Sequence, residues 1–298
     1  MAPPPPGPAS ALSSSEGVTM TDSFRVNVID SIDISPNLRR VTLAGDSLSA
    51  WESTGQPDEF VHIHIPGPDA AEGWEDDHDI ARHYTIRRWD KPANTILVDV
   101  VTHGHGLGAS WARDCQPGDT VAISGARGYY GPPEGSTQRL LFADATGIPA
   151  VARILEEASA EESFQVIIEV LDERDAIDLP SAAEVNVEWI VAGNGLALSE
   201  IESAMAQLET PSDDTYIWVA CETSASRAAR KFVRGQWPRH HSWFRIVGYW
   251  HFNQEERLKK WLALTPEQQA RYAEIWDESR PDEVNWIELE PFLQEVGL

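Results

Sequence analysis

Hydrophobic and polar positions alternate in short segments over the first third of the chain, and turn-forming residues separate one segment from the next. A period of two is typical of strands that bury one face. We expect strands at residues 24–29, 38–43, 60–65, 83–88, 95–102 and 120–124. Short strands at this spacing predict an antiparallel β-barrel or sandwich.

The pattern changes after residues 131–136, a segment rich in glycine and proline. From there, apolar strand-like runs alternate with segments of helical period. We expect strands at residues 139–143, 164–170, 187–191 and 216–220, with helices at 148–158, 198–208 and 224–237. This alternation predicts an α/β domain with a mostly parallel sheet, which is a candidate for nucleotide binding by analogy of fold.

Both ends of the chain differ from this middle part. The first residues are rich in proline and serine and lack the features of a signal peptide, so we expect a disordered tail. Beyond Trp250 the pattern is helical: Thr265 and Gln268 match a capping box, and Pro291 interrupts or starts a last apolar stripe. The predicted parts are a tail (1–21), a β-barrel domain (22–132), an α/β domain (137–250) and a C-terminal helical extension (251–298).

The charge and the cysteine content argue against several classes of partner and metal site. The chain has 23 Lys and Arg against 48 Asp and Glu, a net charge of −25 that repels nucleic acid and anionic lipid. We therefore expect no nucleic-acid partner, and no apolar run is long enough for membrane insertion. Cys115 and Cys221 alone hold neither an iron–sulfur cluster nor a four-cysteine zinc site, so we expect no structural metal. The low cysteine content fits a cytoplasmic location.

The segment 82–87 places a cation, an aromatic ring and a hydroxyl at strand spacing. Arg82 is suited to a phosphate, Tyr84 to the face of an apolar ring, and the Thr85 hydroxyl to a ring nitrogen. Together they are the pattern of a flavin site. Taken alone, the same segment is also an ordinary half-exposed strand.

Three further segments carry candidate chemistry. In residues 103–112, three glycines precede a predicted helix start at which free N–H groups and a hydroxyl suit a pyrophosphate. A plain glycine-rich turn has the same pattern. Residues 144–149 form a tight turn after a strand, and the helix that follows can face phosphate or nicotinamide. They do not match the G-x-G-x-x-G fingerprint. Arg127 is either a ligand-binding cation or a surface arginine.

Read in chain order, six segments between residues 22 and 250 resemble the siderophore-interacting proteins, a branch of the ferredoxin-reductase-like flavoproteins. The segments are RHYTIRRW, VDVVTHGHGLGASWA, PGDTVAISGARG, LLFADATGIPAVARILE, WVACETSASRAARKFVR and VGYW. The resemblance implies a reductase of ferric siderophores, with an FAD-binding barrel followed by an NAD(P)H-binding α/β domain. FAD is the implied cofactor, with NADPH or NADH as the electron donor.

The resemblance also implies roles for individual residues around the flavin. Arg82 would meet the FAD pyrophosphate, Tyr84 would pack beside the ring system, and Thr85 would act in catalysis by a hydrogen bond near the reactive ring nitrogen. Trp250, with Tyr249, would close one side of the flavin. The other implied cofactor-binding residues are His83, His103, Gly104, Ala109 and Ser110.

A second implied set surrounds the nicotinamide donor. Asp144, Thr146 and Pro149 would lie at its approach, with Thr146 as a catalytic residue that orients the hydride donor. Arg227 or Arg230 would take a 2′-phosphate and favour NADPH, although both also fit a solvated helix face. Cys221 and Glu222 would lie near the nucleotide.

The substrate site departs from the family pattern. His62 and His251 stand where the family often has a lysine and an arginine that attract anionic ferric siderophores, so Arg127 is the best remaining cation. Imidazole is largely neutral near pH 7. We therefore expect a substrate site that is less basic, or charged only at lower pH.

The implied mechanism is hydride transfer from NAD(P)H to flavin, followed by single-electron transfer to iron(III) in its chelator, with iron as a substrate. Two alternatives stay open: a flavin-dependent NAD(P)H reductase for another acceptor, and a siderophore-binding protein with little turnover. Ferredoxin is a possible alternative electron donor. The identity of the siderophore and the oligomeric state do not follow from the sequence.

Overall fold

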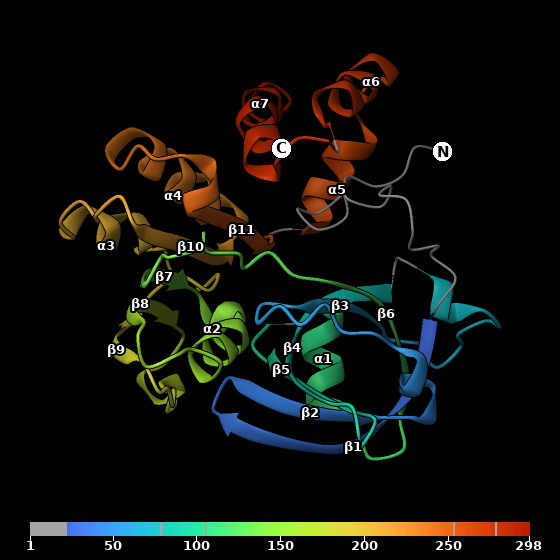
Figure 1. Cartoon of the computed structure of the whole chain (residues 1–298). Coiled ribbons are helices and arrows are strands. Elements are labelled where there is room, and N and C mark those ends of the chain that lie inside the picture. The colour runs from blue at the N-terminus through green and yellow to red at the C-terminus, as the bar shows by residue number, and fades with distance from the viewer. Residues whose placement is uncertain (1–22, 78–79, 105, 253, 278) are drawn as a thin grey trace.

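The chain folds into a β-barrel and an α/β sheet, with a group of helices at its C-terminal end (Figure 1). The computed structural model describes residues 23–77, 80–104, 106–252, 254–277 and 279–298. The predicted N-terminal tail lies outside the described residues. None of the described helices combines the length and apolar character that crossing a membrane requires.

Six antiparallel strands close into the barrel in the order β1-β2-β5-β4-β3-β6. They are β1 Ser23–Ser35, β2 Leu38–Ala44, β3 Phe60–His64, β4 Ala81–Asp90, β5 Thr95–Val101 and β6 Thr120–Arg127. The short helix α1 (Leu107–Asp114) packs Trp111 and Ala112 against the barrel core. The prediction of an antiparallel barrel is confirmed.

Alternation along β3 and β4 decides which side chains point out of the barrel. Val61 and Ile63 lie in the apolar core, so their neighbours face outward. Strand pairing sets His62 opposite His83, and Phe60 opposite Thr85. These four residues therefore share the outer face of the barrel wall.

The second unit is a parallel sheet in the order β11-β10-β7-β8-β9, as predicted. Its strands are β7 Gln138–Ala143, β8 Ser163–Val170, β9 Glu184–Val191, β10 Thr215–Glu222 and β11 Phe244–Trp250. Its helices are α2 Ile148–Glu156, α3 Ile201–Gln207 and α4 Thr223–Gln236. Alternate residues of the central strands enter two apolar clusters, one with α2 and one with α3 and α4. Helices therefore cover both faces of the sheet, as parallel sheets require.

Short 3-10 helices fill several connections. They are η1 Asp46–Ala50, η2 Trp74–Asp76, η4 Ala145–Gly147, η5 Glu173–Asp175 and η6 His241–Trp243. Two details differ from the sequence expectations. Strand β11 is not among the predicted strands, and Pro291 neither starts nor interrupts its helix, since it lies inside α7 (Asp282–Glu295).

The C-terminal helices lie at the β11 edge of the sheet, beside α4 (Figure 1). They are α5 Gln254–Leu262, α6 Pro266–Ile275 and α7, and they share an apolar cluster that includes Trp261, Tyr272 and Phe292. The capping box of Thr265 and Gln268 is formed as predicted. These helices have a core of their own, which is why aromatic residues are frequent in this part of the chain.

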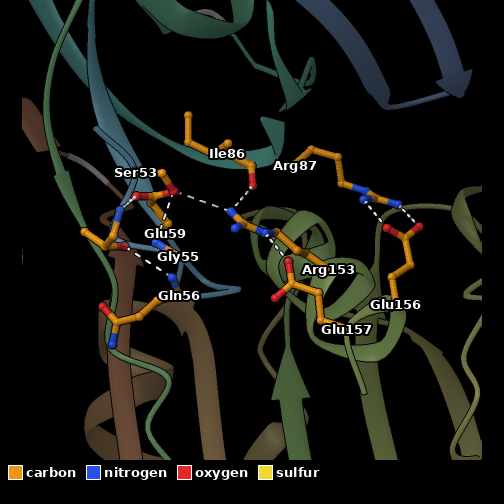
Figure 2. A network of polar contacts seen from close by, with 10 residues as sticks. Ser53, Gly55, Gln56, Glu59, Ile86, Arg87, Arg153, Glu156 and Glu157 are labelled. Carbon is orange, nitrogen blue, oxygen red and sulfur yellow. Dashed lines mark hydrogen bonds and ion pairs between the residues drawn. The ribbon is translucent and has the colours of Figure 1, made fainter. Parts of the chain in front are cut away.

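Ion pairs join the barrel to the sheet (Figure 2). Arg153 of α2 lies 3.5 Å from the buried carboxylate of Glu59 and donates to the carbonyl oxygen of Ile86, 3.2 Å away. Beside it, Arg87 of β4 pairs with Glu156 of α2. The contacts of α2 with Ile86 and Arg87 place this helix directly against β4, and the Arg153–Glu59 pair joins it to the segment before β3.

Candidate active site

Strand β4 contributes the predicted flavin-binding residues. Arg82 and His83 have exposed side chains, whereas Thr85 is buried. Tyr84 lies over the first turn of α1, where a Cβ atom at Gly108 would stand 1.7 Å from the Tyr84 hydroxyl. Only glycine at position 108 permits this contact, so the glycine-rich segment and the tyrosine form one packed unit.

The α1 N-terminus forms the adjacent wall. Its N-cap residue, Gly106, supplies no side-chain acceptor, so the first-turn N–H groups can bind an anion. Arg113 shapes this region from the last turn of α1: it donates to the carbonyl oxygen of Gly104 (2.9 Å) and to the Ser110 hydroxyl (3.2 Å). The predicted pyrophosphate residues and Arg82 thus come from neighbouring parts of the barrel. Of the other predicted residues, Ala109 and His103 are partly exposed.

An aromatic and imidazole cluster covers the outer face of β3 and β4. The rings of His62 and His83 lie 4.2 Å apart, and Phe60 lies 5.5 Å from His83 and 5.6 Å from Tyr129. His83 keeps access to solvent but is surrounded by protein atoms on its other sides, and this desolvation lowers its pKa below the ordinary value; the charges of His62, Arg82 and Arg127 add to this effect. The structure therefore brings His62 and Arg127 together, as the substrate hypothesis requires.

On the sheet side, Asp144 links the carboxyl ends of three strands. Its buried carboxylate accepts hydrogen bonds from the Trp250 indole N–H (2.7 Å), the Glu222 N–H (2.8 Å), and the N–H (2.9 Å) and hydroxyl of Thr146. Burial raises the pKa of Asp144, while these donors act in the opposite direction. These contacts position Thr146 and Glu222, which the resemblance places near the nucleotide, and Trp250, which it places beside the flavin.

A loop after β9 supports the same corner. Asn194 accepts a hydrogen bond from the N–H of Ala145 (3.0 Å), and a Cβ atom at Gly195 would contact the rings of Trp250 and Phe252. Thr223 donates to the carbonyl oxygen of Trp250, 2.9 Å away. The Trp250 ring is therefore fixed from several directions, and the predicted Pro149 is buried in the neighbouring helix α2.

The two halves of the site meet at Thr85 and Tyr249. Thr85 comes from the barrel and Tyr249 from β11, and the Thr85 side chain lies near the Tyr249 hydroxyl. The buried Tyr249 hydroxyl nevertheless has no hydrogen-bond partner of good geometry among the described residues, and neither do the Tyr129 hydroxyl and the Trp111 indole N–H. Buried polar groups without partners are rare in folded proteins. The Tyr129 and Tyr249 hydroxyls lie near one another, which fits a site completed by a polar ligand.

These features fit the binding of FAD. The exposed guanidinium of Arg82 and the free N–H groups of α1 suit a pyrophosphate, and the aromatic ring of Tyr84 suits the flat ring system. Thr85 and Tyr249 add hydroxyl groups where the barrel meets the sheet. Together these groups suit a large ligand that is anionic at one end and aromatic at the other.

Other predicted site residues occupy different surroundings. His251 does not join His62: it contacts Thr223 and Arg257, and burial, together with Arg257 and Arg227, lowers its pKa to about 3. It therefore stays neutral at pH 5.5, so it does not supply the low-pH charge that the sequence hypothesis expected.

Three predicted nucleotide residues lie on or beside α4. Glu222 caps this helix by accepting from the N–H groups of Ser224 and Ala225. Burial raises the pKa of the Cys221 thiol well above its ordinary value, so this thiol stays protonated. Arg230 is buried and ion-paired with Glu283, so it is not available to a 2′-phosphate.

Sequence reasoning missed two groups of functional candidates. Arg257 and Lys260 of α5 line one cavity with Arg227, and the sequence predicted no binding role for the C-terminal helices. The closely spaced cations of α5 were the available signal. The buried carboxylate of Glu169 was also missed, because only the fold brings it near the loop that follows β9.

Glu169 makes the stability of this corner depend on pH. Its carboxylate accepts from the Ser199 hydroxyl (3.0 Å) and the Glu200 N–H, and burial raises its pKa to about 7 from the ordinary 4.5. As the pH rises from 4.5 to 7, the unfolded chain loses a proton that the folded protein keeps, so the free energy of unfolding falls. Below pH 4.5 the buried carboxyl of Glu169 causes no loss of stability, and above pH 7 the loss of stability is complete.

We expect Glu169→Gln to remove this pH dependence. At pH 4 the free energy of unfolding of the variant should equal that of wild type, and at pH 8 it should be about 2 kcal/mol higher. This gain is smaller than the full pKa shift implies, because the amide accepts weaker hydrogen bonds. Urea unfolding at pH 4, 6 and 8 measures the difference. A constant difference across this range would contradict the assignment of Glu169 as the titrating group.

Family models match both parts of this architecture. The model described as siderophore-interacting FAD-binding domain covers residues 27–130, and the one described as siderophore-interacting protein covers residues 136–253. The NADPH-dependent ferric-chelate reductase of Escherichia coli is 28% identical over 233 residues, which are 73% of this chain and 89% of that protein. The ferric vibriobactin reductase ViuB of Vibrio cholerae is 26% identical over 73% of this chain and 85% of its own length.

Solved structures agree in fold. A siderophore utilization protein from T. fusca superposes with a TM-score of 0.68 at 26% identity, covering 78% of this chain and 94% of that structure. The siderophore-interacting protein SipS from Aeromonas hydrophila gives a TM-score of 0.70 at 23% identity, over 80% and 95% of the two chains. Phthalate dioxygenase reductase, with a TM-score of 0.53 and 15% identity over 78% of this chain and 67% of that structure, shares only the fold.

Proposed function

This chain belongs to the siderophore-interacting protein family, and from that premise we propose that it is an FAD-dependent reductase of ferric siderophores with NADPH as electron donor. One observation carries the proposal for this chain. Arg153 of α2 donates to the carbonyl oxygen of Ile86, next to Thr85, so the barrel strand suited to a flavin is held against the helix that follows Asp144. An electron donor and an electron carrier need such a shared junction.

In the proposed arrangement the barrel holds FAD. Arg82 and the N-terminus of α1, with Ala109 and Ser110, bind the pyrophosphate, while Tyr84 and His83 contact the ring system and His103 and Gly104 lie along it. FAD bound there would supply the chemistry of the reaction, namely acceptance of a hydride from the nicotinamide and single-electron transfer to iron(III). Thr85 acts by orienting the ring through its hydroxyl.

The sheet holds and orients the donor in this proposal. Asp144 fixes Thr146 and Trp250, so the Thr146 side chain positions the nicotinamide and the Trp250 ring excludes water from one side. Pro149, Cys221 and Glu222 complete the surroundings of the nucleotide. The buried, fully bonded Asp144 acts as a positioning residue, with no proton to transfer.

The ferric chelate would meet the outer face of the barrel. His62 and Arg127 lie beside His83 there, which gives a site with aromatic surfaces and the permanent charge of Arg127. Iron is a substrate, and reduction to iron(II) weakens its binding by hard oxygen ligands. The domain boundaries at 22–132 and 137–250, the cytoplasmic location and the use of ferredoxin as donor stay predictions.

Arg82 provides a test of the flavin site. Since a charge-assisted contact to phosphate contributes about 1.5–3 kcal/mol, Arg82→Ala should weaken FAD binding ten-fold or more. Arg88→Ala is the matched control, because Arg88 is also an exposed arginine of β4. Fluorescence titration of apoprotein with FAD gives both affinities. Equal affinities for the two variants would contradict the placement of the pyrophosphate.

Steady-state assays separate the proposed function from its alternatives. We expect purified protein to carry FAD and to oxidise NADPH when a ferric siderophore is supplied, with iron(II) trapped by a ferrous-specific chelator. A reductase for another acceptor would oxidise NADPH with quinones or dyes and leave ferric siderophores unreduced. A siderophore-binding protein would bind the chelate tightly and oxidise no NADPH.

A further inference from the structure

A basic cavity lies where α4 begins, between the end of β11 and the C-terminal helices. Its volume is about 240 Å³, and its lining includes Glu222, Thr223, Arg227, His251, Arg257 and Lys260. Sites that enclose a drug-sized ligand usually measure about 300–1,000 Å³. This cavity therefore suits one small group of a larger molecule, while the rest of that molecule lies outside.

Two arginines of the cavity have unused donors. The Nε atoms of Arg227 and Arg257 are buried and have no hydrogen-bond partner among the residues whose side chains the structure describes. Other atoms hold each guanidinium in place: Arg227 donates to a main-chain oxygen of Leu298 (2.7 Å), which also lines the cavity, and Arg257 donates to His251. The arginines are thus fixed and incompletely satisfied, which is costly without an acceptor.

The charges in the cavity favour an anion. Burial and the neighbouring Arg227 lower the pKa of Arg257 to about 10, and His251 stays neutral beside it. The carboxylate of Glu222 faces this region, but it is committed to the N–H groups of Ser224 and Phe252. An anion with two or more acceptor oxygens would accept hydrogen bonds from both guanidinium groups and reduce the repulsion between them.

We propose that this cavity binds a single oxyanion group, a carboxylate or a phosphate, of one of the anionic substrates of this enzyme. The inference rests on the proposed function, which supplies two such substrates: a phosphorylated nicotinamide nucleotide and an acidic ferric chelate. Arg227 and Arg257 bind the oxyanion oxygens. Lys260, which is exposed on α5, adds charge at the rim.

The cavity assigns a binding role to the C-terminal helices. Arg257 and Lys260 lie on α5, beyond the two family matches, which end at residues 130 and 253. Arg227 lies within the second match and on α4. One wall of the cavity thus comes from the matched region, and the other from the segment that follows it.

Binding measurements on the FAD-loaded protein test this role. The variants are Arg257→Gln combined with Lys260→Gln, Arg257→Lys, and Lys259→Gln as a control from the same helix that leaves the cavity lining intact. Anaerobic stopped-flow titration gives Kd for NADPH and NADH. Tryptophan fluorescence gives Kd for two redox-inert probes, gallium(III) citrate and a neutral gallium(III) trihydroxamate.

The double variant should lose ten-fold or more in affinity for NADPH but not NADH, or for gallium citrate but not the trihydroxamate. The first result identifies the nucleotide phosphate as the ligand, and the second identifies the chelate carboxylates. Arg257→Lys should keep part of the affinity, and Lys259→Gln all of it.

Unchanged affinities in the double variant would overturn the inference, as would equal losses for all four ligands or equal losses in Lys259→Gln. The proposed function fails separately. If neither nucleotide reduces the wild-type flavin, that proposal is wrong, whereas binding of gallium citrate still reports on the cavity.

Discussion

Asp144→Ala should lower the rate constant for flavin reduction by NADPH about 100-fold, while the FAD content stays near that of wild type. The carboxylate is the common acceptor for Trp250, Glu222 and Thr146, and no other described residue accepts from the Trp250 indole. Removing it leaves these donors unpaired and frees the residues that position the nicotinamide. The barrel residues proposed to bind FAD do not depend on these contacts.

Stopped-flow reduction at saturating NADPH measures this effect directly. Asp144→Asn is the conservative control, since its amide oxygen still accepts on one side, and we expect a loss of about ten-fold. Thermal unfolding of both variants separates a local change from general destabilisation. Rapid reduction by a folded Asp144→Ala protein would contradict the positioning role.

Arg230→Met should lower the free energy of unfolding by about 3–5 kcal/mol. Arg230 is fully buried and donates to Glu283, 2.9 Å away, and to the carbonyl oxygen of Ile246. Its guanidinium also lies 5.5 Å from the ring of Trp286. These contacts join α4, β11 and α7, and the substitution leaves the buried carboxylate of Glu283 without its cation.

Urea unfolding followed by tryptophan fluorescence gives this difference. Arg234→Met is the matched control, because Arg234 is an exposed arginine of the same helix and its loss should cost less than about 0.5 kcal/mol. Adding Glu283→Gln to Arg230→Met should recover part of the stability. Equal stability of the two arginine variants would show that this ion pair does not hold the C-terminal helices.

The barrel and the parallel sheet could be predicted because their signals are local. Turn residues mark the ends of the barrel strands, and the switch to helical period marks the second unit. Pro291 shows where a local rule failed. Its missing N–H argues against a helix, but the neighbouring Leu289, Phe292 and Leu293 are buried in the C-terminal cluster, and this packing outweighs the local cost.

Contacts between distant residues could not be predicted in the same way. Asp144 and Trp250 are 106 residues apart, and Arg230 and Glu283 are 53 apart, so neither pair has a signal in local spacing. His251 is the clearest example. No local pattern predicts that His251 is buried in contact with Arg257, and burial together with this contact lowers its pKa.

Anaerobic single turnover tests the central claim most directly. The purified protein is first reduced with one equivalent of NADPH and then mixed with a ferric siderophore in the presence of a ferrous-specific chelator. The proposed function predicts bleaching of the flavin by NADPH, recovery of its oxidised spectrum on mixing, and two iron(II) released for each NADPH. A flavin that NADPH does not bleach, or that stays reduced when the ferric siderophore is added, would contradict it.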